Sequence, residues 1–369
     1  MNFDLTDEQE LLRNITSEVL ERNYDVEKRL KVTETEQGWS RDVWGQLAEM
    51  GILGLGFDPD EAGQVELTVV LTEIGRRLAP EPVAAAALIP GGIIAELGDD
   101  RHAKLLDAVA EGQTLLALAH HEPGMRGVST RVMTRAERQG DSWTVTGRKN
   151  PVLAGDAADV FVVSASLPDD GGVGLFVVNA DAVSRSAFRT FDGQRGASVE
   201  FPSAPAEALG AGGDASQGLH GALIRHQSAL CAEAVGAMAE ALRLTTEYLT
   251  TRKQFGVPLS TFQTLTHRAA DMYVSLELAR SMSLYAAMSI ADGNPDPVIA
   301  ARAMLQVCRS GRHIAQEAIQ LHGGIGVTAE YPVGHYAARL TAISQTLGSA
   351  DDHLRILTRG LDDYGTVSL

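Results

Sequence analysis

Apolar residues recur at helical spacing through the first third of the chain. Thr6 followed by Gln9 forms the pattern of a capping box at a helix start. The apolar residues that follow are spaced as on one helix face: Leu12, Ile15, Val19 and Leu20. A second helix is expected to begin near Ser40 and to end at Gly51, because glycine readily takes the left-handed conformation past a helix terminus.

The helical pattern continues over Leu67 to Leu78 and over Pro82 to Leu97. Pro90 must kink or divide the second of these segments, because proline has no backbone N–H to donate. Residues 1–113 are therefore expected to form an all-helical N-terminal domain.

From Thr114 onward the pattern is that of strands. Short β-branched or apolar runs are separated by Gly, Asp and Pro: Leu115–Ala119, Trp143–Thr146, Val160–Ser164 and Val173–Val178. Two interruptions suit hairpin turns, Gln139-Gly140-Asp141 and Asp169-Asp170-Gly171-Gly172. This regular spacing predicts a compact β-sandwich or barrel over residues 114–209.

The last third returns to long helices after a glycine-rich loop, Gly210 to Asp214. Four segments sustain helical spacing: Ala222–Tyr248, Phe262–Ile290, Pro297–Leu321 and Val333–Leu347. They predict a four-helix bundle over residues 210–369, with surplus apolar surface that favours burial against another subunit. The whole chain is thus expected to be an α+β multidomain protein, in the order helical, β, helical.

The composition and charge of the chain argue against some classes of function. The 369 residues carry 31 Lys and Arg against 48 Asp and Glu, a net charge of −17 without a long basic run, which argues against nucleic acid as a partner. No stretch approaches the roughly 20 apolar residues that cross a bilayer, and the first residues lack a signal-peptide pattern. We expect no membrane association and a cytoplasmic location.

The two cysteines, Cys231 and Cys308, both lie within apolar helical patterns. A free thiol in such a place behaves as a small hydrophobic side chain. We therefore expect no disulfide, no nucleophile and no metal site from these residues.

Three motifs stand in order along the chain. They are Phe3-Asp4-Leu5-Thr6-Asp7-Glu8-Gln9, then Arg252-Lys253-Gln254-Phe255-Gly256, then Gln320-Leu321-His322-Gly323-Gly324-Ile325-Gly326. With Glu122-Pro123-Gly124 and Gly147-Arg148-Lys149 in the β region, the chain resembles the FAD-dependent acyl-CoA dehydrogenase family over essentially its whole length. The resemblance implies that family's fold and the α,β-dehydrogenation of an acyl-CoA thioester, with electrons passed to an electron-transfer flavoprotein.

The resemblance also implies which residues contact FAD. In similar proteins the second and third motifs reach across a dimer interface to the adenosine and pyrophosphate half of the neighbour's FAD. The corresponding residues here are Arg252, Gln254, Phe255, Gln320, Leu321, Gly323 and Gly324. An arginine fork suits a pyrophosphate, and glycines permit close approach of the main chain. The structural alternative is a solvated helix end followed by a turn.

The family's catalytic base, a glutamate, has no counterpart in this sequence. Two positions carry it in different branches of the family, and these are occupied by Leu347 and His226. Leucine cannot accept a proton. A neutral imidazole can, so His226 is a weak candidate for the base. Glu233 and Asp351 are other nearby proton acceptors, without support from a motif.

Other elements that would serve the chain's own flavin ring and substrate have changed. The segment after Lys149 reads Asn150-Pro151-Val152-Leu153-Ala154-Gly155, where related proteins place an aromatic residue and a Thr or Ser. His121 stands where the family has a hydroxyl, and Met125-Arg126-Gly127-Val128 replaces a small, Ser-containing turn. The elements lent across the dimer persist.

This contrast predicts a helper subunit. It would pair with a homologous, base-bearing chain in a two-plus-two heterotetramer and complete that partner's FAD site. Acyl-CoA dehydrogenases of two unlike chains occur among actinobacterial enzymes that degrade steroid side chains, so lipid or steroid degradation is the expected pathway class. Two alternatives remain open: a self-sufficient homotetramer that uses His226 or another base, and a non-catalytic scaffold or binding protein of the same fold.

Overall fold

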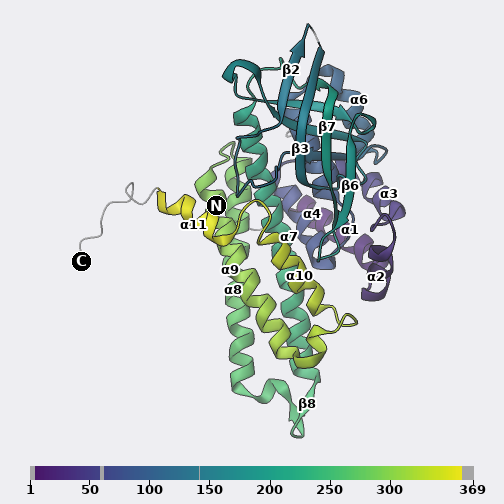
Figure 1. Cartoon of the computed structure of the whole chain (residues 1–369). Coiled ribbons are helices and arrows are strands. Elements are labelled where there is room, and N and C mark those ends of the chain that lie inside the picture. Colours follow the sequence, from purple (N-terminus) through teal and green to yellow (C-terminus); the bar gives the residue numbers. More distant parts are fainter. Residues whose placement is uncertain (1–4, 59–61, 141, 360–369) are drawn as a thin grey trace, which may run out of the picture. The chain divides into compact units, whose positions relative to one another are not determined.

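The computed structural model describes residues 5–58, 62–140 and 142–359, and it follows the predicted order of helices, sheet and helices (Figure 1). Phe3 and Asp4 of the opening motif and Asp141 of the first predicted turn lie outside the described residues.

The N-terminal region is helical, as predicted. Its α-helices are α1 (Asp7–Asn23), α2 (Val26–Glu34), α3 (Arg41–Glu49), α4 (Gln64–Arg77), α5 (Ile89–Leu97) and α6 (Ala103–Ala110). The capping box of α1 is present, with Thr6 accepting a hydrogen bond from the Gln9 backbone N–H, and Ser40 caps α3. The helices α2 and α6 were not predicted. Helix α2 is short and polar and buries only Thr33, so it shows little apolar periodicity.

Pro90 divides its helical segment, as expected. A π-helical stretch, η2 (Ala84–Leu88), comes first, and Pro90 then lies in the first turn of α5. That is the position where a helix needs no N–H from the residue.

The central region is a closed sheet. Strands β1 (Leu116–Ala119), β2 (Arg135–Gln139), β3 (Ser142–Leu153), β4 (Val160–Ser166), β5 (Val173–Asn179), β6 (Ser184–Arg189) and β7 (Arg195–Ala208) form it. β4 pairs with both β2 and β5, so the path β4-β2-β3-β7-β5 returns to β4 and confirms the barrel alternative. The prediction missed β2, β6 and β7. β2 and β6 are largely exposed and lack alternating apolar residues, whereas β7 carries prolines.

The C-terminal region contains long helices, as predicted. They are α7 (Ser216–Thr251), α8 (Gln263–Ala291), α9 (Pro297–His322) and α10 (Val333–Ile343), and Figure 1 shows α8 and α9 side by side. Two corrections apply. α10 ends at Ile343, and Leu347, with a positive φ of 58°, lies beyond it in a non-helical conformation; a fifth helix, α11 (Ala350–Arg359), follows.

Contacts divide the described chain into two compact units. The first contains the described parts of Met1–Glu27, Thr68–Ala79 and Gln227–Leu369, and the second contains those of Lys28–Leu67 and Pro80–His226. The predicted domain ranges 1–113, 114–209 and 210–369 follow the types of elements along the chain and stay a prediction.

Within the first unit, α4 crosses α7 at very short range. A Cβ built on Gly75 would lie 1.9 Å from the Glu233 carbonyl oxygen, and one on Gly236 would lie 1.8 Å from the Thr72 carbonyl oxygen. No side chain fits in that space, so both glycines are required by this contact.

The two cysteines are free and buried in the bundle core. Burial raises the pKa of the Cys308 thiol to about 11, and that of Cys231 is raised further. Both therefore stay protonated at neutral pH, in agreement with their predicted role as small apolar side chains.

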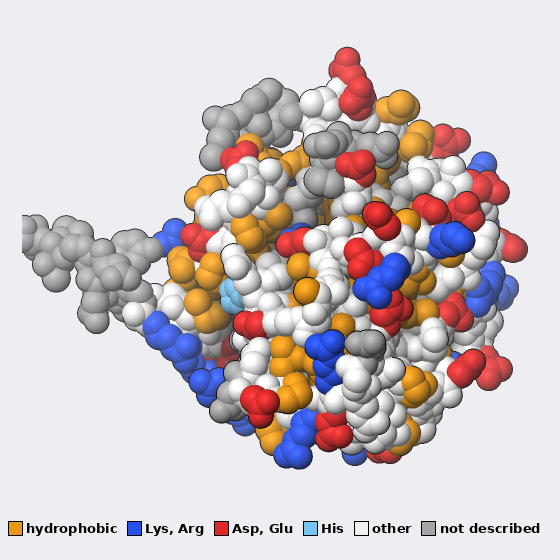
Figure 2. All heavy atoms as spheres, turned by 90° about the horizontal axis from the view of Figure 1, so that it is seen from above, with side chains coloured by type: hydrophobic (Ala, Val, Ile, Leu, Met, Phe, Trp, Pro, Cys, Tyr) orange, Lys and Arg blue, Asp and Glu red, His pale blue; other side chains and the backbone are white. Residues whose placement is uncertain are grey.

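Acidic and basic side chains are interspersed with apolar ones on the face shown in Figure 2. Within the described ranges, no helix has both the length and the apolar character needed to cross a membrane.

Substitution of Gly236 by Ala should destabilise the first unit by about 1–3 kcal/mol, because the new methyl group overlaps the Thr72 carbonyl. Gly221→Ala in the same helix is the matched control. Its Cβ would meet only the Arg225 guanidinium at 3.6 Å, and alanine favours helix. Urea denaturation measures both variants. Equal stability of the two variants would contradict the predicted close crossing.

Candidate functional site: two pockets at the end of the helical bundle

One pocket of about 530 Å³ lies where α7, α8 and α9 meet, and we call it the α7–α9 pocket. Its lining residues are Tyr248, Arg252, Gln254, Leu259, Leu265, Arg268, Gln320, Leu321, His322, Gly323, Gly324 and Ile325. All the predicted cofactor residues except Phe255 are among them, although they come from motifs almost seventy positions apart.

A tight hairpin after α7 presents Arg252. The Arg252 N–H donates to the Tyr248 carbonyl over 2.8 Å, and its own carbonyl accepts from the Leu259 N–H over 2.9 Å. Between them, strands β8 (Lys253–Gln254) and β9 (Val257–Pro258) pair antiparallel. The turn residues Phe255 and Gly256 both have positive φ, 53° and 83°, as a two-residue hairpin turn requires.

The other arm of the pocket is the glycine-rich turn after α9. Gly323 has φ 65° and ψ −140°, a conformation that side chains rarely adopt. Gly326 is closely packed, since its Cβ would lie 3.0 Å from the Ile319 carbonyl oxygen. A Cβ on Gly324 would meet nothing within 4 Å, so the fold itself does not demand glycine there.

The polar groups of this pocket fit a dinucleotide's phosphates and sugar. Among the described residues, the Arg252 guanidinium and the side-chain amides of Gln254 and Gln320 have no hydrogen-bond or ion-pair partner, whereas Arg268 is paired with Glu317 at 2.5 Å. One unpaired planar cation beside two free amides can bind a pyrophosphate and a ribose.

Phe255 lies at the hairpin tip rather than in the pocket. Its side chain is 90% exposed, with an edge-to-face contact to Phe262 at 6.2 Å between ring centroids. The structure therefore does not bring Phe255 together with the other predicted cofactor residues.

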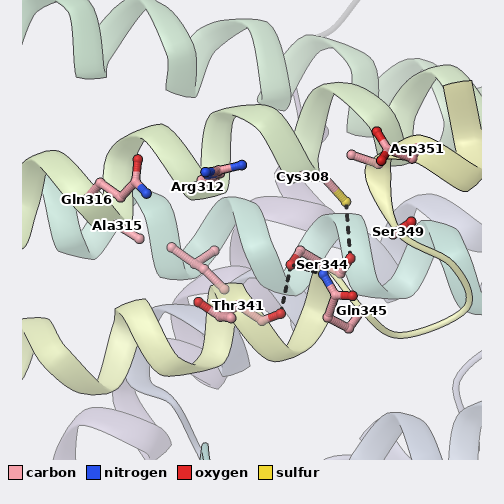
Figure 3. A pocket seen from close by; sticks show the side chains of 11 residues that line it. Cys308, Arg312, Ala315, Gln316, Thr341, Ser344, Gln345, Ser349 and Asp351 are labelled. Carbon is pink, nitrogen blue, oxygen red and sulfur yellow. Dashed lines mark hydrogen bonds between the residues drawn. The ribbon is translucent and has the colours of Figure 1, made fainter.

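A second pocket, of about 410 Å³, lies between α9, α10 and the start of α11, and we call it the α9–α11 pocket. Figure 3 shows Arg312 and Gln316 of α9 facing Thr341 and the chain that follows it. Gln345 and Ser349 in its lining flank Leu347, the position where the family carries glutamate. Leu347 itself packs against the bundle core and has no proton acceptor.

The other predicted proton acceptors differ in their surroundings. Glu233 receives two hydrogen bonds from Arg339, at 2.6 and 2.8 Å, which makes it half of a buried ion pair. Asp351 is exposed and lines the α9–α11 pocket. His226 is half-buried on α7 and belongs to the other compact unit.

In the β region, Glu122 and Lys149 form a buried ion pair. The sequence placed each residue in a motif but did not predict that they pair. Lys149 is fully buried, and its ammonium donates to Glu122 at 2.8 Å, to Ser164 at 3.1 Å and to the His120 carbonyl at 3.2 Å. Burial lowers the pKa of Lys149 to about 8, against the opposing effect of Glu122. For Glu122, burial raises the pKa, but hydrogen bonds from Lys149 and Thr134 outweigh it and hold the value at about 2.

This network shapes the long segment between β1 and β2. Glu122 accepts hydrogen bonds from the backbone N–H groups of Met133 and Thr134 and so closes the segment at its base. Nε2 of His120 donates to the Ser129 carbonyl at 2.8 Å, which leaves Nδ1 to accept from the Ser164 hydroxyl. Burial, followed by the charge of Lys149, lowers the pKa of His120 to about 4.

The altered flavin-ring segment adjoins this network. The Asn150 N–H donates to the His121 carbonyl at 2.8 Å, and the Asn150–Pro151 peptide bond is cis. Pro151 is exposed, so neither an aromatic ring nor a hydroxyl is presented at this place.

Sequence reasoning missed six residues of the pocket lining, three apolar ones (Leu259, Leu265 and Ile325) and three with polar groups (Tyr248, Arg268 and His322). Tyr248 precedes Arg252 by one helical turn, which places it on the same face of α7. His322 stands inside a quoted motif, yet its burial beneath the pocket depends on packing between helices, which a motif does not report.

Comparisons with known proteins agree with this geometry. The family model for the acyl-CoA dehydrogenase C-terminal domain matches residues 221–361. Acyl-CoA dehydrogenase FadE12 of Mycobacterium tuberculosis is 31% identical over 327 residues, which cover 82% of this chain and 84% of that protein. FadE27 of the same organism is 25% identical over 98% of this chain and 99% of that protein.

Solved structures give the same result. A variant of the Tcur3481-Tcur3483 steroid ACAD aligns with a TM-score of 0.89 and 31% identity, over 97% of this chain and 98% of that chain. The ChsE4-ChsE5 complex from Mycobacterium tuberculosis aligns with a TM-score of 0.88 and 25% identity, over 99% and 100% of the two chains. This chain belongs to the acyl-CoA dehydrogenase family, and that membership supports the predicted class of FAD-dependent oxidoreductase.

Lys149→Met should lower the free energy of unfolding by about 3–5 kcal/mol, because it leaves the Glu122 carboxylate buried without its counter-ion. Arg148→Met is the matched control. Arg148 is exposed and lies 4.0 Å from Glu200, a surface pair worth at most about 1 kcal/mol. Chemical denaturation compares the two. A loss no larger for Lys149→Met than for Arg148→Met would show that the buried pair does not hold this region together.

The pKa of Glu122 in the folded chain, about 2, lies below its ordinary value of 4.5. Its ionisation therefore contributes stability that is complete above pH 4.5 and is lost as the pH falls from 4.5 towards 2. We expect Glu122→Gln to have a flatter loss of stability over this window than the unmodified chain, measured by urea denaturation at successive pH values. Parallel acid profiles would contradict the predicted low pKa.

Proposed function

We propose that this chain is the helper subunit of an FAD-dependent acyl-CoA dehydrogenase built from two unlike chains. It lends its α7–α9 pocket to the adenosine and pyrophosphate half of an FAD that is bound mainly by a base-bearing, homologous partner. The observation that carries the proposal is the contrast between the two pockets. The α7–α9 pocket contains Arg252, Gln254 and Gln320, which can bind a dinucleotide, whereas the α9–α11 pocket has no glutamate in its lining.

The donors of the lent pocket support this role. Arg252 has no counter-ion among the described residues, although it stands in a chain with 17 more acidic than basic charges. Holding one cation free of carboxylates favours an anionic ligand. Gly324 supports the same conclusion, because only a ligand approaching the main chain would require the missing side chain.

Exposed apolar residues on the two arms of this pocket, the β8–β9 hairpin and the turn Gly323–Val327, favour a protein neighbour. Phe255 and Val327 are 90% and 73% exposed, and Ile325, which lines the pocket, is 42% exposed. Large apolar side chains grouped at one site are typical of an interface. Burial against a partner chain would cover them and would enclose whatever part of a cofactor enters the pocket.

The division of chemical work follows from the residues. FAD, when bound, supplies the acceptor for the hydride that leaves the β-carbon of the acyl-CoA. This chain's part is to bind and orient: Arg252 offsets phosphate charge, and the amides of Gln254 and Gln320 offer hydrogen bonds to the sugar and phosphates. Removal of the α-proton is assigned to a glutamate of the partner, because Leu347 cannot accept a proton.

The substrate class rests on relatives. Two aligned structures are described as a steroid ACAD and as the ChsE4-ChsE5 complex. We infer a steroid or other lipid acyl-CoA as the substrate of the complex, an electron-transfer flavoprotein as the electron acceptor and the cytoplasm as the location.

A second candidate function is a self-sufficient enzyme, and one observation favours it. Asp351 places an exposed carboxylate in the lining of the α9–α11 pocket, four residues after Leu347 in the chain. If the chain purified without a partner turned over acyl-CoA and Asp351→Asn or His226→Ala abolished that turnover, this alternative would replace the helper role. A chain that stays free of flavin with every partner would instead favour a scaffold.

Arg252→Ala in this chain should weaken FAD binding by the mixed complex about tenfold to a hundredfold, because a hydrogen bond to a charged group is worth about 1.5–3 kcal/mol. Arg280→Ala is the matched control, since Arg280 is an exposed arginine of α8 already paired with Glu277. Fluorescence titration of the flavin-depleted complex measures both. Unchanged affinity in Arg252→Ala would rule out the lent-pocket role.

A further inference from the structure

Three aromatic side chains lie beneath the α7–α9 pocket and link its two arms. They are Tyr248 near the end of α7, His322 at the end of α9 and Tyr331 in the loop before α10. Tyr248 and His322 have ring centroids 4.5 Å apart, and His322 and Tyr331 have theirs 4.8 Å apart. Tyr248 also meets Tyr331 edge-to-face at 6.3 Å, so each ring touches both others.

Hydrogen bonds fix the orientation of the histidine ring. His322 is buried, and its Nδ1 lies 2.7 Å from the Ala318 carbonyl oxygen, which can only accept, so Nδ1 carries the proton. Nε2 then accepts from the Tyr331 hydroxyl over 3.2 Å. Burial lowers the pKa of His322, against the opposing carbonyls of Ala318 and Leu244, and so favours this neutral form.

Two of these residues adjoin an arm of the pocket through the backbone. The Tyr248 carbonyl accepts the N–H of Arg252, so the position of the tyrosine sets the start of the hairpin that presents the guanidinium. His322 immediately precedes Gly323, the residue with the conformation that turns the chain away from α9. The His322 ring contacts the Tyr248 ring, and this contact connects the two arms.

We propose that His322 is a positioning residue for FAD: held by Ala318 and Tyr331, it fixes the Arg252 arm and the Gly323–Gly324 arm of the pocket at one separation. A pyrophosphate and its ribose bind both arms at once, so a change in separation weakens the ligand although no contacting group is lost. This inference rests on the proposed function, since it specifies how the same pocket is kept in its binding geometry.

The chain offers variants that separate positioning from general stability. Tyr331→Phe removes only the hydroxyl that holds His322, and His322→Leu removes both hydrogen bonds and the ring contacts. Tyr336→Phe is the matched control, because the Tyr336 hydroxyl also donates a hydrogen bond, at 2.6 Å, but to the Arg76 carbonyl of α4 and not to the ring cluster of Tyr248, His322 and Tyr331. His322→Gln can keep an acceptor for Tyr331 and serves as the conservative rescue.

The measurement is the dissociation constant for FAD of the flavin-depleted mixed complex, with the melting temperature recorded alongside. Tyr331→Phe and His322→Leu should each raise the constant about tenfold, and the double variant should equal His322→Leu, because both act through one contact. His322→Gln should recover most of the affinity. Tyr336→Phe should lower the melting temperature and leave the FAD constant within about twofold.

The outcomes also separate this inference from the function on which it rests. If Arg252→Ala weakens FAD while His322→Leu and Tyr331→Phe do not, the positioning role is overturned and the lent pocket stands. Losses in Tyr331→Phe no larger than in Tyr336→Phe also overturn it. If Arg252→Ala itself leaves FAD binding unchanged, both proposals fail.

Discussion

The site depends on one electrostatic constraint: both arms of the α7–α9 pocket follow the carboxyl end of a helix. The unpaired carbonyl groups at such ends carry partial negative charge, which disfavours a phosphate. A pocket of this kind can bind a nucleotide only if a cation and main-chain N–H groups offset that charge. The hairpin that presents Arg252, the glycine turn after α9 and the aromatic contacts that hold them together all serve this requirement.

The chain's two pockets differ in the chemical groups that they offer to a ligand. An arginine at a helix carboxyl end is itself favoured by the partial negative charge there, so the argument for a ligand rests on the absence of a carboxylate partner among the described residues, which leaves the Arg252 guanidinium available to an anion. Leu347, by contrast, packs into the bundle core and contributes to stability while offering no chemistry. The carboxylate of Glu233, another candidate proton acceptor, is held in an ion pair with Arg339. Under the proposed function, one chain combines a surface that binds the cofactor with a position, Leu347, that serves only packing.

Much of this architecture could be predicted from the sequence. A long amphipathic helix such as α9 carries a strong periodic signal, and buried strands such as β4 appear as continuous apolar runs. Exposed strands such as β6 have no such signal, and Leu347, beyond the end of α10, has a backbone conformation that periodicity cannot report.

The residues of the proposed FAD contact were predictable for a different reason. Arg252, Gln320 and Gly324 stand in motifs, so a family resemblance identifies them without any knowledge of contacts. His322 and Tyr248 act through packing between helices far apart in the chain, and Lys149 through a buried ion pair with Glu122. Such relations exist only once the chain is folded. Phe255 shows the converse, since its motif is intact but its side chain lies outside the pocket.

The most direct test of the helper role is the number of FAD molecules per chain, measured by absorbance and native mass on this chain alone and on its complex with a homologous, glutamate-bearing dehydrogenase. The account predicts a colourless chain on its own and a mixed tetramer with about one FAD per pair of unlike chains. A homotetramer of this chain that holds one FAD per chain would contradict it.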